Sequence, residues 1–414
     1  MSRRTAYIVL ALASALPRLI ALAIERGDIV EAYVDKGDTF ARTYLADGTY
    51  GFIPGVPSAY TQPLYGFFLV PLYWVFGRHW LVVGLAHVAV AVGTAFVVYE
   101  LARRLVDCRA ALLAALLTTL HPYLIWHDVH MNREILDQAL AAGAVLLTLL
   151  VAERSSPWWT GVLGADLGLM ILGNVRTAFA PLILAAYVLW RRRAWAWEPV
   201  AALVLAALVV APWVVRNERS VGCVAITTDA RALWKANNVY TLETLRAGKW
   251  IDDVPLTGTP LSPQDAGELY AETGRVVRVD ECAQMRDYRS RAIDFAEEHP
   301  GEKAQLAAVG AKFLWQPTVP KTEGRPGKGT LLDVGRDWAE PLYMVPIFLL
   351  AVYGLLLVPR HFAVLALALL AYATLVAMAF VGETRYRVPW DFLLTIPAAA
   401  AVSRLWLRRD RALG

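Results

Sequence analysis

The topology of this chain depends on residues 63–77, whose sequence is PLYGFFLVPLYWVFG. A helix that crosses a bilayer needs roughly 20 apolar residues, and this stretch offers only about fifteen, with two prolines among them. Tyr65, Tyr73 and Trp74 are aromatic residues of the kind that gather at the interface between membrane and water. We therefore expect a helix that lies on the membrane surface rather than one that crosses the membrane.

Longer apolar runs recur on both sides of this stretch. The chain has 414 residues, of which 57% are hydrophobic and only 18% charged, and its mean hydropathy is +0.44. A soluble domain of this composition would leave too much apolar surface in water, so we expect an all-α multi-pass membrane protein. About ten runs have the length of a membrane span: residues 6–24, 79–103, 110–127, 134–152, 158–173, 176–190, 198–215, 341–358, 362–381 and 389–407.

Clusters of arginine indicate which ends of these runs face the cytoplasm, because cytoplasmic loops carry an excess of basic residues. The clusters consist of Arg3, Arg4, Arg103, Arg104, Arg109, Arg191 to Arg193, Arg408, Arg409 and Arg411. Both termini are thus expected in the cytoplasm. The segments expected outside are residues 25–78, 128–133, 174–175, 216–340 and 382–388. Because the basic residues sit at span ends, the net charge of +4 does not indicate nucleic-acid binding.

These assignments divide the chain into three parts. Residues 1–215 form an N-terminal transmembrane module with an outer loop at 25–78, residues 216–340 form an outer domain, and residues 341–414 form a C-terminal transmembrane module. The first apolar run lacks a small-residue cleavage site, so we expect it to be retained rather than removed as a signal peptide. Pro/Gly-rich pieces alternate with an amphipathic helix at about 284–298 in the outer domain, which predicts a small, mixed structure there.

The three cysteines are too few and too scattered for a zinc module or a disulfide scaffold. Cys223 and Cys282 both fall in the expected outer domain, where an oxidising compartment would allow them to pair. No spacing fixes their proximity, so the pairing stays open. Cys108 is expected to be a reduced thiol on the cytoplasmic side.

The first outer loop contains the sequence YVDKGDTFARTYLADGTYGF, which places Asp35 and Asp38 shortly after the first span and Gly48 at the following turn. A carboxylate held just above the bilayer can deprotonate a hydroxyl group while that group attacks a membrane-bound donor. The alternative is that both aspartates are solvated loop charges or helix caps.

Several segments in the same order resemble bacterial membrane glycosyltransferases. These segments are Asp35 with Asp38 and Gly48, QPLYGFFLVPLYWVFG (62–77), VVYELARRLVDCRAALLAALL (97–117), Arg133-Glu134, APWVVRNERSVG (211–222) and GETRYRVPWD (382–391). The chain is similar to the family of the dolichyl-phosphate-mannose protein mannosyltransferases and the aminoarabinose transferase of lipid A, which have the GT-C fold. The resemblance covers about residues 35–238 and 341–397.

The resemblance implies a sugar donor linked to polyprenyl phosphate and a catalytic base in the first outer loop. By position this base is Asp35. Relatives often carry a second acidic residue beside it, whereas this chain has Lys36, so Asp38 is the candidate for the second acid. Members of this branch do not generally require a metal, and no other cofactor is expected.

The departing lipid phosphate needs cations or oriented hydrogen-bond donors as its charge develops. Arg385 and Arg387 in the last outer loop, with Arg176 at the outer end of its span, are the candidates, and Tyr386 between the first two is a candidate substrate contact. The structural alternative is that these arginines reach to anionic headgroups from helix ends.

Arg18 lies unusually deep in the first span. An ionisable residue at that depth should face the bundle interior and have a partner. We expect a structural ion pair, with Asp166 as one candidate partner, or else contact with the carrier phosphate.

Two further stretches carry polar residues outside. WHDVHMNRE (126–134) brings together His127, Asp128, His130 and Glu134. His127 and His130 share a helical face, so a metal site with Asp35 is one alternative. Glu134 is a candidate catalytic residue and His130 a candidate substrate contact. In WKANNVY (234–240), Asn237 and Asn238 are further candidates for contact with a sugar or an acceptor.

The sequence thus predicts an inverting glycosyltransferase of a bacterial inner membrane whose site faces outward. It would use a polyprenyl-phosphate sugar and a hydroxyl acceptor on a glycolipid, a polysaccharide or a protein. Two alternatives remain: a transporter or flippase of a lipid-linked glycan, and a non-catalytic assembly subunit. A transporter should carry broken helices in paired positions and charges at the membrane midplane, whereas the charges here gather at the outer rim. The sequence indicates neither the sugar, nor the acceptor, nor the oligomeric state.

Overall fold

The computed structural model describes the chain except residues 1, 33, 193–196, 248, 257–258, 318–330 and 414. Arg193, expected on the cytoplasmic side, therefore lies outside the described residues. Within them the structure is helical, and an isolated bridge between Ile53 and Val56 is the one strand-like pairing described. The expected all-α class is confirmed.

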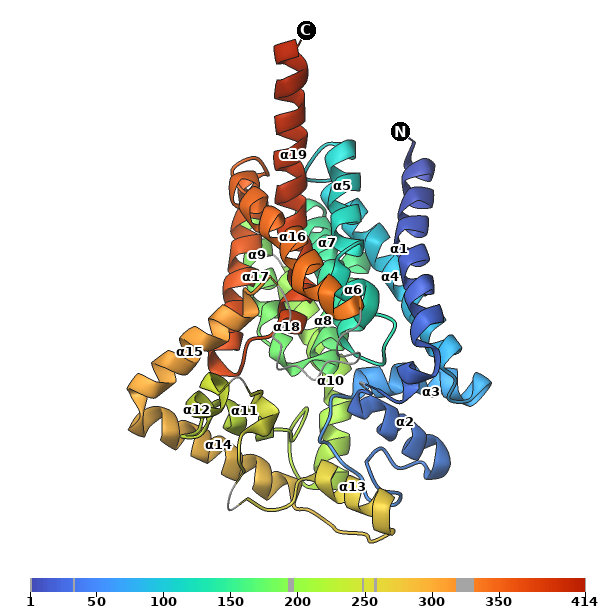
Figure 1. Ribbon diagram of the computed structural model, residues 1–414, viewed down its shortest axis with the longest axis vertical. Helices are drawn as coiled ribbons and strands as arrows, with labels where there is room; N and C mark the ends of the chain where they lie inside the picture. Colours follow the sequence, from blue (N-terminus) through green and yellow to red (C-terminus); the bar gives the residue numbers. More distant parts are fainter. Residues whose placement is uncertain are drawn as a thin grey trace.

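Eleven of the described helices form the bundle. They are α1 (Arg3–Glu25), α4 (Trp80–Ala102), α5 (Cys108–Thr119), α6 (Pro122–His127), α7 (Glu134–Glu153), α8 (Pro157–Gly173), α9 (Ala180–Arg192), α10 (Trp197–Val221), α16 (Leu331–Gly354), α17 (Arg360–Ala379) and α19 (Phe392–Leu413). The start of α1 and the end of α19 lie at the same end of this bundle (Figure 1).

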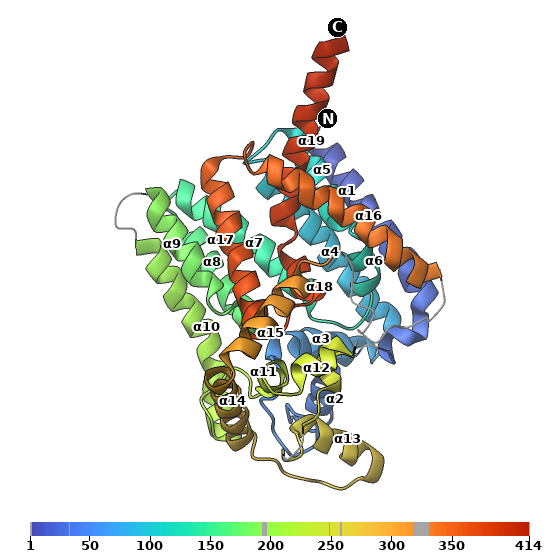
Figure 2. The same ribbon diagram turned by 60° about the vertical axis from the view of Figure 1, so that its left-hand side comes forward.

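Seven further helices gather toward the opposite end of the bundle, which we call the polar end (Figures 1 and 2). They are α2 (Lys36–Asp47), α3 (Pro63–Phe76), α11 (Arg231–Ala236), α12 (Thr241–Arg246), α13 (Pro263–Thr273), α14 (Glu281–Glu298) and α15 (Pro300–Leu314). The short α18 (Thr384–Arg387) lies nearer the middle of the molecule, in contact with α15 and α17. Short 3₁₀ turns occupy Arg26–Val30, Val175–Thr177, Ile251–Asp253 and Val388–Trp390. The amphipathic helix expected at about 284–298 corresponds to α14.

Five described segments are long and apolar enough to cross a membrane: α1 with the turn that follows it, α4, α7, α10 and α17. The other expected spans correspond to helices that are shorter or carry more charge. The expected single run at 110–127 is wrong, because it forms two helices, α5 and α6. Pro122 begins α6, and a proline has no N–H with which to continue the preceding helix. His121 caps α6 by accepting the Tyr123 N–H at 3.2 Å.

The first helix shows how a membrane helix buries only one narrow face. Its buried residues recur every four positions, at Ala6, Leu10, Ser14, Arg18 and Leu22. This spacing places them on one stripe of the helix, since residues four apart lie above one another. The exposed side chains on the other faces are large and apolar, as expected where lipid is the solvent.

Small residues let α8 and α10 approach closely. Gly164 and Gly168 are four residues apart, the spacing at which glycines open a flat path on a membrane helix. A Cβ atom at Gly164 would lie 2.6 Å from Leu205 Cβ, and one at Gly168 would lie 2.6 Å from Val209 Cβ. The close contact of these two helices therefore depends on the absence of side chains at both positions.

Residues 63–77 form α3 and its terminal Gly77, and α3 lies beside α2 at the polar end (Figure 1). Its buried residues include Tyr65 and Tyr73, while Trp74 is largely exposed. The helix expected here is therefore present, and its tyrosines contact both the first outer loop and the bundle. The Tyr73 hydroxyl donates to Asp38, and the Tyr65 hydroxyl lies 3.2 Å from His87 Nε2 of α4.

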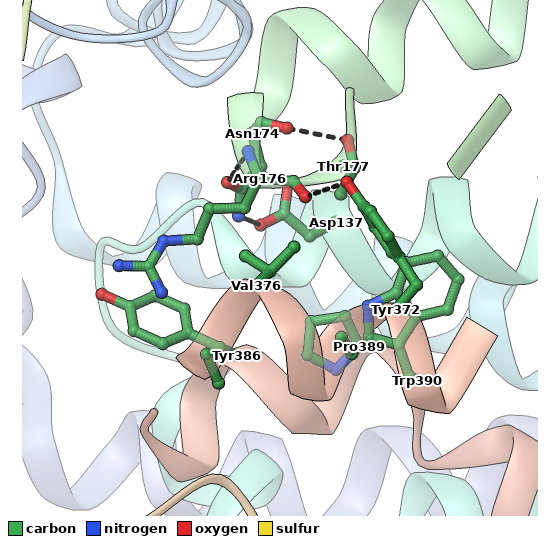
Figure 3. Close-up of a pocket in the computed structure, with 11 residues that line it drawn as sticks. Asp137, Asn174, Arg176, Thr177, Tyr372, Val376, Tyr386, Pro389 and Trp390 are labelled. Carbon is green, nitrogen blue, oxygen red and sulfur yellow. Dashed lines mark hydrogen bonds between the residues drawn. The ribbon is translucent and has the colours of Figure 1, made fainter. Parts of the chain in front are cut away.

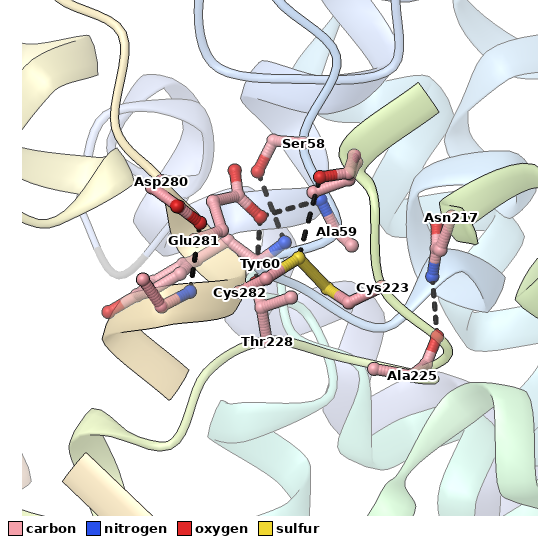
Figure 4. Close-up of a disulfide and its surroundings, with 12 residues drawn as sticks. Ser58, Ala59, Tyr60, Asn217, Cys223, Ala225, Thr228, Asp280, Glu281 and Cys282 are labelled. Atoms are coloured by element: carbon pink, nitrogen blue, oxygen red, sulfur yellow. Dashed lines mark hydrogen bonds between the residues drawn. A yellow bond between two sulfur atoms is a disulfide. The ribbon is translucent and has the colours of Figure 1, made fainter. Parts of the chain in front are cut away.

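Cys223 and Cys282 form a disulfide with their Cα atoms 5.8 Å apart (Figure 4). This bond joins the second residue after α10 to the first turn of α14, so the start of the expected outer domain is tied to its amphipathic helix. Helix α10 continues beyond residue 216, where the sequence placed the start of the outer domain, and ends at Val221. Cys108 is a free, exposed thiol.

Candidate active site at the polar end

Asp35 immediately precedes α2, and the local sequence explains how it is held. Its backbone N–H donates to the Met131 carbonyl at 2.8 Å, and its Oδ1 accepts the Gly37 N–H at 2.7 Å, which caps the helix. Helix α2 ends at Gly48, whose φ of +79° suits glycine. No described residue donates a hydrogen bond to Asp35 Oδ2. The half-buried carboxylate thus has one anchored oxygen and one unoccupied oxygen.

The surroundings of Asp35 carry mixed charge. Burial raises the pKa of Asp35 above its ordinary value, while the Arg133 guanidinium and the Gly37 N–H act to lower it. Arg133 comes from the loop before α7, where its Nη1 donates to Gln62 and its Nε has no hydrogen-bond partner among the described residues. Glu134 follows directly and lies within electrostatic reach of Asp35, Arg133 and Arg385.

Tyr386 connects this region to the last outer loop. The Arg176 guanidinium carbon lies 3.5 Å from the centre of the Tyr386 ring (Figure 3). The Arg385 guanidinium carbon lies 4.9 Å from the same centre. Arg385 also forms an ion pair with the buried Glu383. The charge of Arg133 interacts with both Asp35 and Tyr386. The charge of Arg133 therefore acts on one residue of the first outer loop and on one of the last outer loop.

Arg176 and Tyr386 also border a small pocket of about 30 Å³ between α7, α17 and the Val388–Trp390 turn (Figure 3). A cavity of this size can hold a water molecule. Asp137 lines it and accepts the Asn174 amide at 2.8 Å through Oδ2, while its Oδ1 has no hydrogen-bond partner in the described part of the chain. The pocket thus holds a buried carboxylate that can accept a further hydrogen bond.

Asp38, the expected second acid, has its partners elsewhere, and its Oδ2 accepts no hydrogen bond from the described residues. It is buried, and its Oδ1 accepts the Tyr73 hydroxyl at 2.6 Å and the Arg78 Nε at 2.9 Å, while Arg42 lies 3.2 Å from its Oδ2. Two arginines and a tyrosine thus hold this carboxylate against α3. It joins α2 to α3 instead of opening toward Asp35.

Arg387, expected to bind the donor phosphate, is fully buried. Its Nε donates to Asp391 at 3.0 Å, and its Nη1 donates to the carbonyls of Leu314 and Gln316 at 2.9 and 2.5 Å. These contacts tie the last outer loop to the end of α15. The guanidinium therefore has a structural role in this arrangement, although two positions away Arg385 remains partly exposed.

Arg18 forms an ion pair in the bundle, as one of its two alternatives predicted, but its expected partner is wrong. Its Nη2 lies 2.7 Å from Asp128 Oδ2, and both side chains are almost completely buried. Asp166 lies instead against Gly143 of α7. Arg18 is therefore neutralised within the bundle and does not reach the outer loops as a phosphate ligand.

The histidines that suggested a metal site have separate partners. His127 faces Glu134 at 3.6 Å, whereas His130 faces Glu25 at 3.5 Å and donates through Nδ1–H to the Trp126 carbonyl at 2.9 Å. Over the part of the chain that the structure describes, no group of three or more potential ligands is close enough to hold a metal ion. His130 is buried, so its expected role as a substrate contact has no open surface in this arrangement.

Asn237 and Asn238, expected to contact a sugar or acceptor, are buried and use their amides locally. Asn237 donates to Leu233 and Ala379 and accepts from Lys303 Nζ at 2.5 Å. Asn238 donates to Trp234 and accepts the Tyr240 N–H at 2.8 Å. Both side chains hold the turn after α11 together.

The sequence interpretation missed the importance of Arg133 and Asp137. Arg133 was visible as part of the Arg133-Glu134 pair, and Asp137 as an acid in the first turn of an otherwise apolar run. Residues three and four apart share a helical face. The spacing of Glu134 and Asp137 therefore predicts that both side chains lie on one face of the helix. That signal was present in the sequence.

Residues 58–215 match the family of the dolichyl-phosphate-mannose-protein mannosyltransferases. The matched segment contains Arg133, Glu134 and Arg176 but neither Asp35 nor the last outer loop, and it is less than half of the chain. No curated protein sequence matches this chain.

Solved structures are similar over almost the entire chain. The oligosaccharyltransferase of the archaeon Archaeoglobus fulgidus, in complex with an inhibitory peptide and a dolichol-phosphate, superposes with a TM-score of 0.55 at 16% identity and covers 98% of this chain. The same enzyme tethered to an acceptor peptide gives a TM-score of 0.52 at 14% identity and covers 99%. This chain spans about half of that enzyme's length, 51% in both comparisons.

A third structure, ArnT from Cupriavidus metallidurans bound to undecaprenyl phosphate, is 17% identical and covers 97% of this chain and 78% of its own, with a TM-score of 0.44. The helical fold and the matched segment both indicate a membrane glycosyltransferase fold. The chain has the fold of the GT-C membrane glycosyltransferases and resembles the dolichyl-phosphate-mannose-protein mannosyltransferase family over residues 58–215.

Proposed function

We propose that this protein is an inverting glycosyltransferase that moves a sugar from a polyprenyl-phosphate carrier to a hydroxyl acceptor at the polar end. The observation that carries the proposal is the Asp35 carboxylate, which is anchored through Oδ1, leaves Oδ2 unoccupied by the described residues, and lies within electrostatic reach of Arg133. A base and a cation thus belong to the same site.

In the proposed reaction Asp35 Oδ2 takes the proton of the acceptor hydroxyl. The hydroxyl oxygen forms a bond to the anomeric carbon, and the bond from that carbon to the phosphate oxygen breaks. The electron pair leaves with the polyprenyl phosphate. Attack from the face opposite the leaving group inverts the anomeric configuration, and the proton remains on Asp35 until it passes to water.

Three arginines are suited to the negative charge that grows on the leaving phosphate. Arg133 has an unpartnered Nε among the described residues, Arg385 is partly exposed, and Arg176 is held against Tyr386. Cations positioned before the reaction stabilise such charge with little reorganisation. We assign the phosphate to this set and leave Arg387 and Arg18 to their buried ion pairs.

Two comparisons support a lipid carrier. The solved archaeal oligosaccharyltransferase of the same fold holds a dolichol-phosphate, and the matched family is described by a dolichyl-phosphate-linked sugar. The apolar surface of the bundle would allow such a carrier to approach the polar end from the membrane. A bacterial inner membrane, with the polar end outward, is the location that we propose.

The test is release of sugar from a panel of undecaprenyl-phosphate sugars by the purified protein in lipid nanodiscs. Asp35→Asn keeps the size and the helix cap but removes the base, so turnover should fall by roughly 10²- to 10⁴-fold. The matched control is Glu31→Gln, an exposed carboxylate in the same loop, and it should leave turnover unchanged.

Unchanged turnover in Asp35→Asn would remove Asp35 as the base. If no donor is consumed but the protein carries a labelled lipid-linked glycan across a vesicle membrane, the transporter alternative replaces the enzyme. If Asp35→Asn is inactive, mass spectrometry of the lipids that copurify with this variant should identify the carrier, because an enzyme without its base should retain its donor.

A further inference from the structure

Lys36 stands directly beside Asp35 in the sequence and begins α2. Its Nζ lies 3.0 Å from Asp229 Oδ2 and 4.6 Å from the centre of the Tyr60 ring. Asp229 lies almost 200 residues further along the chain, at a separation of 193, in the segment that follows α10. The pair therefore joins the first outer loop to the outer domain.

Asp229 is itself held in a fixed register against the first outer loop. The Thr228 N–H donates to the Ala59 carbonyl at 2.9 Å, and the Thr227 hydroxyl donates to the Tyr60 carbonyl at 2.9 Å. The Asp229 N–H in turn donates to the Thr227 hydroxyl oxygen at 3.2 Å. Two neighbouring contacts thus fix the backbone that presents the carboxylate to Lys36.

The buried Glu281 clamps the same two segments together (Figure 4). Its Oε2 accepts the Ala59 N–H at 3.0 Å and the Thr228 hydroxyl at 2.7 Å. The next residue, Cys282, is bonded to Cys223. A continuous set of contacts therefore runs from the disulfide, through Glu281 and Thr228, to Asp229 and Lys36.

We propose that Lys36 is a positioning residue: its ion pair with Asp229 anchors the start of α2 to the outer domain and so holds the Asp35 carboxylate in its reactive orientation. This inference rests on the proposed function of Asp35. An isolated ion pair on an open surface contributes little, but this one is half-buried, stacked on Tyr60 and backed by Glu281.

The first test needs no turnover. Hydrogen exchange is followed in peptides that cover residues 34–40 and 226–231 in lipid nanodiscs. Both Lys36→Met and Asp229→Asn should speed exchange in both peptides, because either variant removes the contact that joins them. The control is Lys249→Met, an exposed lysine of the outer domain, which should change neither peptide. Unchanged exchange in both single variants would overturn the anchoring role.

The second test reads the position and ionisation of Asp35. Lys36→Met should lower kcat by roughly ten- to a hundredfold, because a small misplacement of a reacting group is enough for such a loss, while KM for the donor stays near its original value. Lys36→Arg retains the pair and should restore most of kcat. Faster exchange with an unchanged kcat would show that the pair anchors the loop without positioning the base, and would overturn the proposal.

A charge swap separates anchoring from the direct effect of the lysine charge. Six titratable groups interact electrostatically with the Asp35 carboxylate: Lys36, Arg133, Glu134, Asp137, Tyr50 and Tyr65. In the Lys36→Asp/Asp229→Lys variant the slow exchange should return, because the ion pair is restored. The acid limb of the pH–rate profile should nevertheless move to higher pH, since an anion now adjoins Asp35.

These outcomes differ from a failure of the proposed function. If Asp35→Asn retains full turnover while Lys36→Met still speeds exchange in both peptides, the anchor stands and the assigned base is wrong. If Asp35→Asn is inactive and the exchange of neither peptide responds, the base stands and the anchor is wrong.

Discussion

The Asp35 carboxylate combines a structural contact with a proposed chemical one. Its Oδ1 caps α2, which holds the group in place, and its Oδ2 is the proposed site of proton transfer. Burial raises its pKa above its usual range, so the charged form needed for catalysis is present only above that raised value. The hydrogen bond to Oδ1 thus orients the side chain, and burial raises the pKa of the carboxyl group.

The pH dependence of turnover follows from this arrangement. A base must be ionised, so kcat/KM should fall as the pH drops through the raised pKa of Asp35, at a higher pH than an ordinary carboxyl group near about 4 would give. Arg133→Gln removes the cation that lowers the pKa of Asp35, so the acid limb should move to still higher pH. A pH–rate profile measures both.

Arg26→Gln is the matched control for this experiment, because Arg26 is an exposed arginine of the first outer loop. It should leave the acid limb where it is in the unaltered protein. An acid limb that does not move in Arg133→Gln would mean that another group controls the ionisation of the base.

Arg387 is predicted to support folding rather than donor binding. Arg387→Met leaves the buried Asp391 carboxylate with His121, 3.6 Å away, as its remaining basic neighbour, and breaking such a buried arginine pair typically costs about 3–5 kcal/mol. The double variant Arg387→Met/Asp391→Leu removes both charges and should regain much of that loss. Unfolding of the three proteins in detergent compares the free energies. A stable Arg387→Met variant with weak donor binding would instead favour the phosphate-binding role that the sequence suggested.

At the scale of helices, α15 joins the polar end to the bundle through a close contact with α17. A Cβ atom at Gly310 would lie 2.3 Å from the Ala377 carbonyl oxygen. Seven residues earlier on α15, Lys303 Nζ donates to the carbonyls of Met378 and Ala379 at 3.0 and 3.2 Å, which caps the end of α17. The loop that carries Arg385 and Tyr386 begins immediately after that end.

This contact predicts a large difference between two glycines of the same helix. Gly310→Ala should force α15 away from α17, lower the stability and reduce turnover, because the last outer loop would shift with the helix. Gly301→Ala meets nothing within 4 Å and should be neutral or stabilise by up to about 1 kcal/mol, since alanine favours helix. Thermal unfolding and turnover of the two variants test the prediction. Equal behaviour would show that the helices can separate without consequence.

At the scale of the whole molecule, the ends of the chain lie opposite the polar end (Figure 1). The distribution of arginine predicts that the chain ends face the cytoplasm. The exposed Cys108 should therefore react with a membrane-impermeant maleimide only after cells are permeabilised. A cysteine introduced by Glu297→Cys on the exposed surface of α14, in a Cys108→Ser background, should react in intact cells.

Labelling of both positions from the same side would contradict this topology. It would also remove the proposed outward-facing site, because α14 and the first outer loop are held at one end of the molecule through the disulfide and Glu281. The experiment therefore tests the orientation of the site as well as that of the chain ends.

The sequence alone determined the helices and the general place of the chemistry. Apolar runs form helices in a membrane because every backbone group must find its hydrogen bond within the segment, and run length is a local property. Asp35 could be placed at the polar end from the sequence as well, because it follows the first apolar run by a few residues. The two-helix structure of residues 110–127 was also within reach, because Pro122 is a local signal.

Only the tertiary structure decided which charges are free for chemistry. Arg18 pairs with Asp128, 110 residues away, and not with Asp166. Arg387 pairs with Asp391 and Asp38 with Arg78, whereas Arg133 forms no ion pair among the described residues. Each of the three side chains still has one nitrogen or oxygen without a hydrogen-bond partner in the described part of the chain. A buried charge takes the partner that helix packing brings within a few ångströms, and packing depends on side-chain fit between helices that no spacing along the chain specifies.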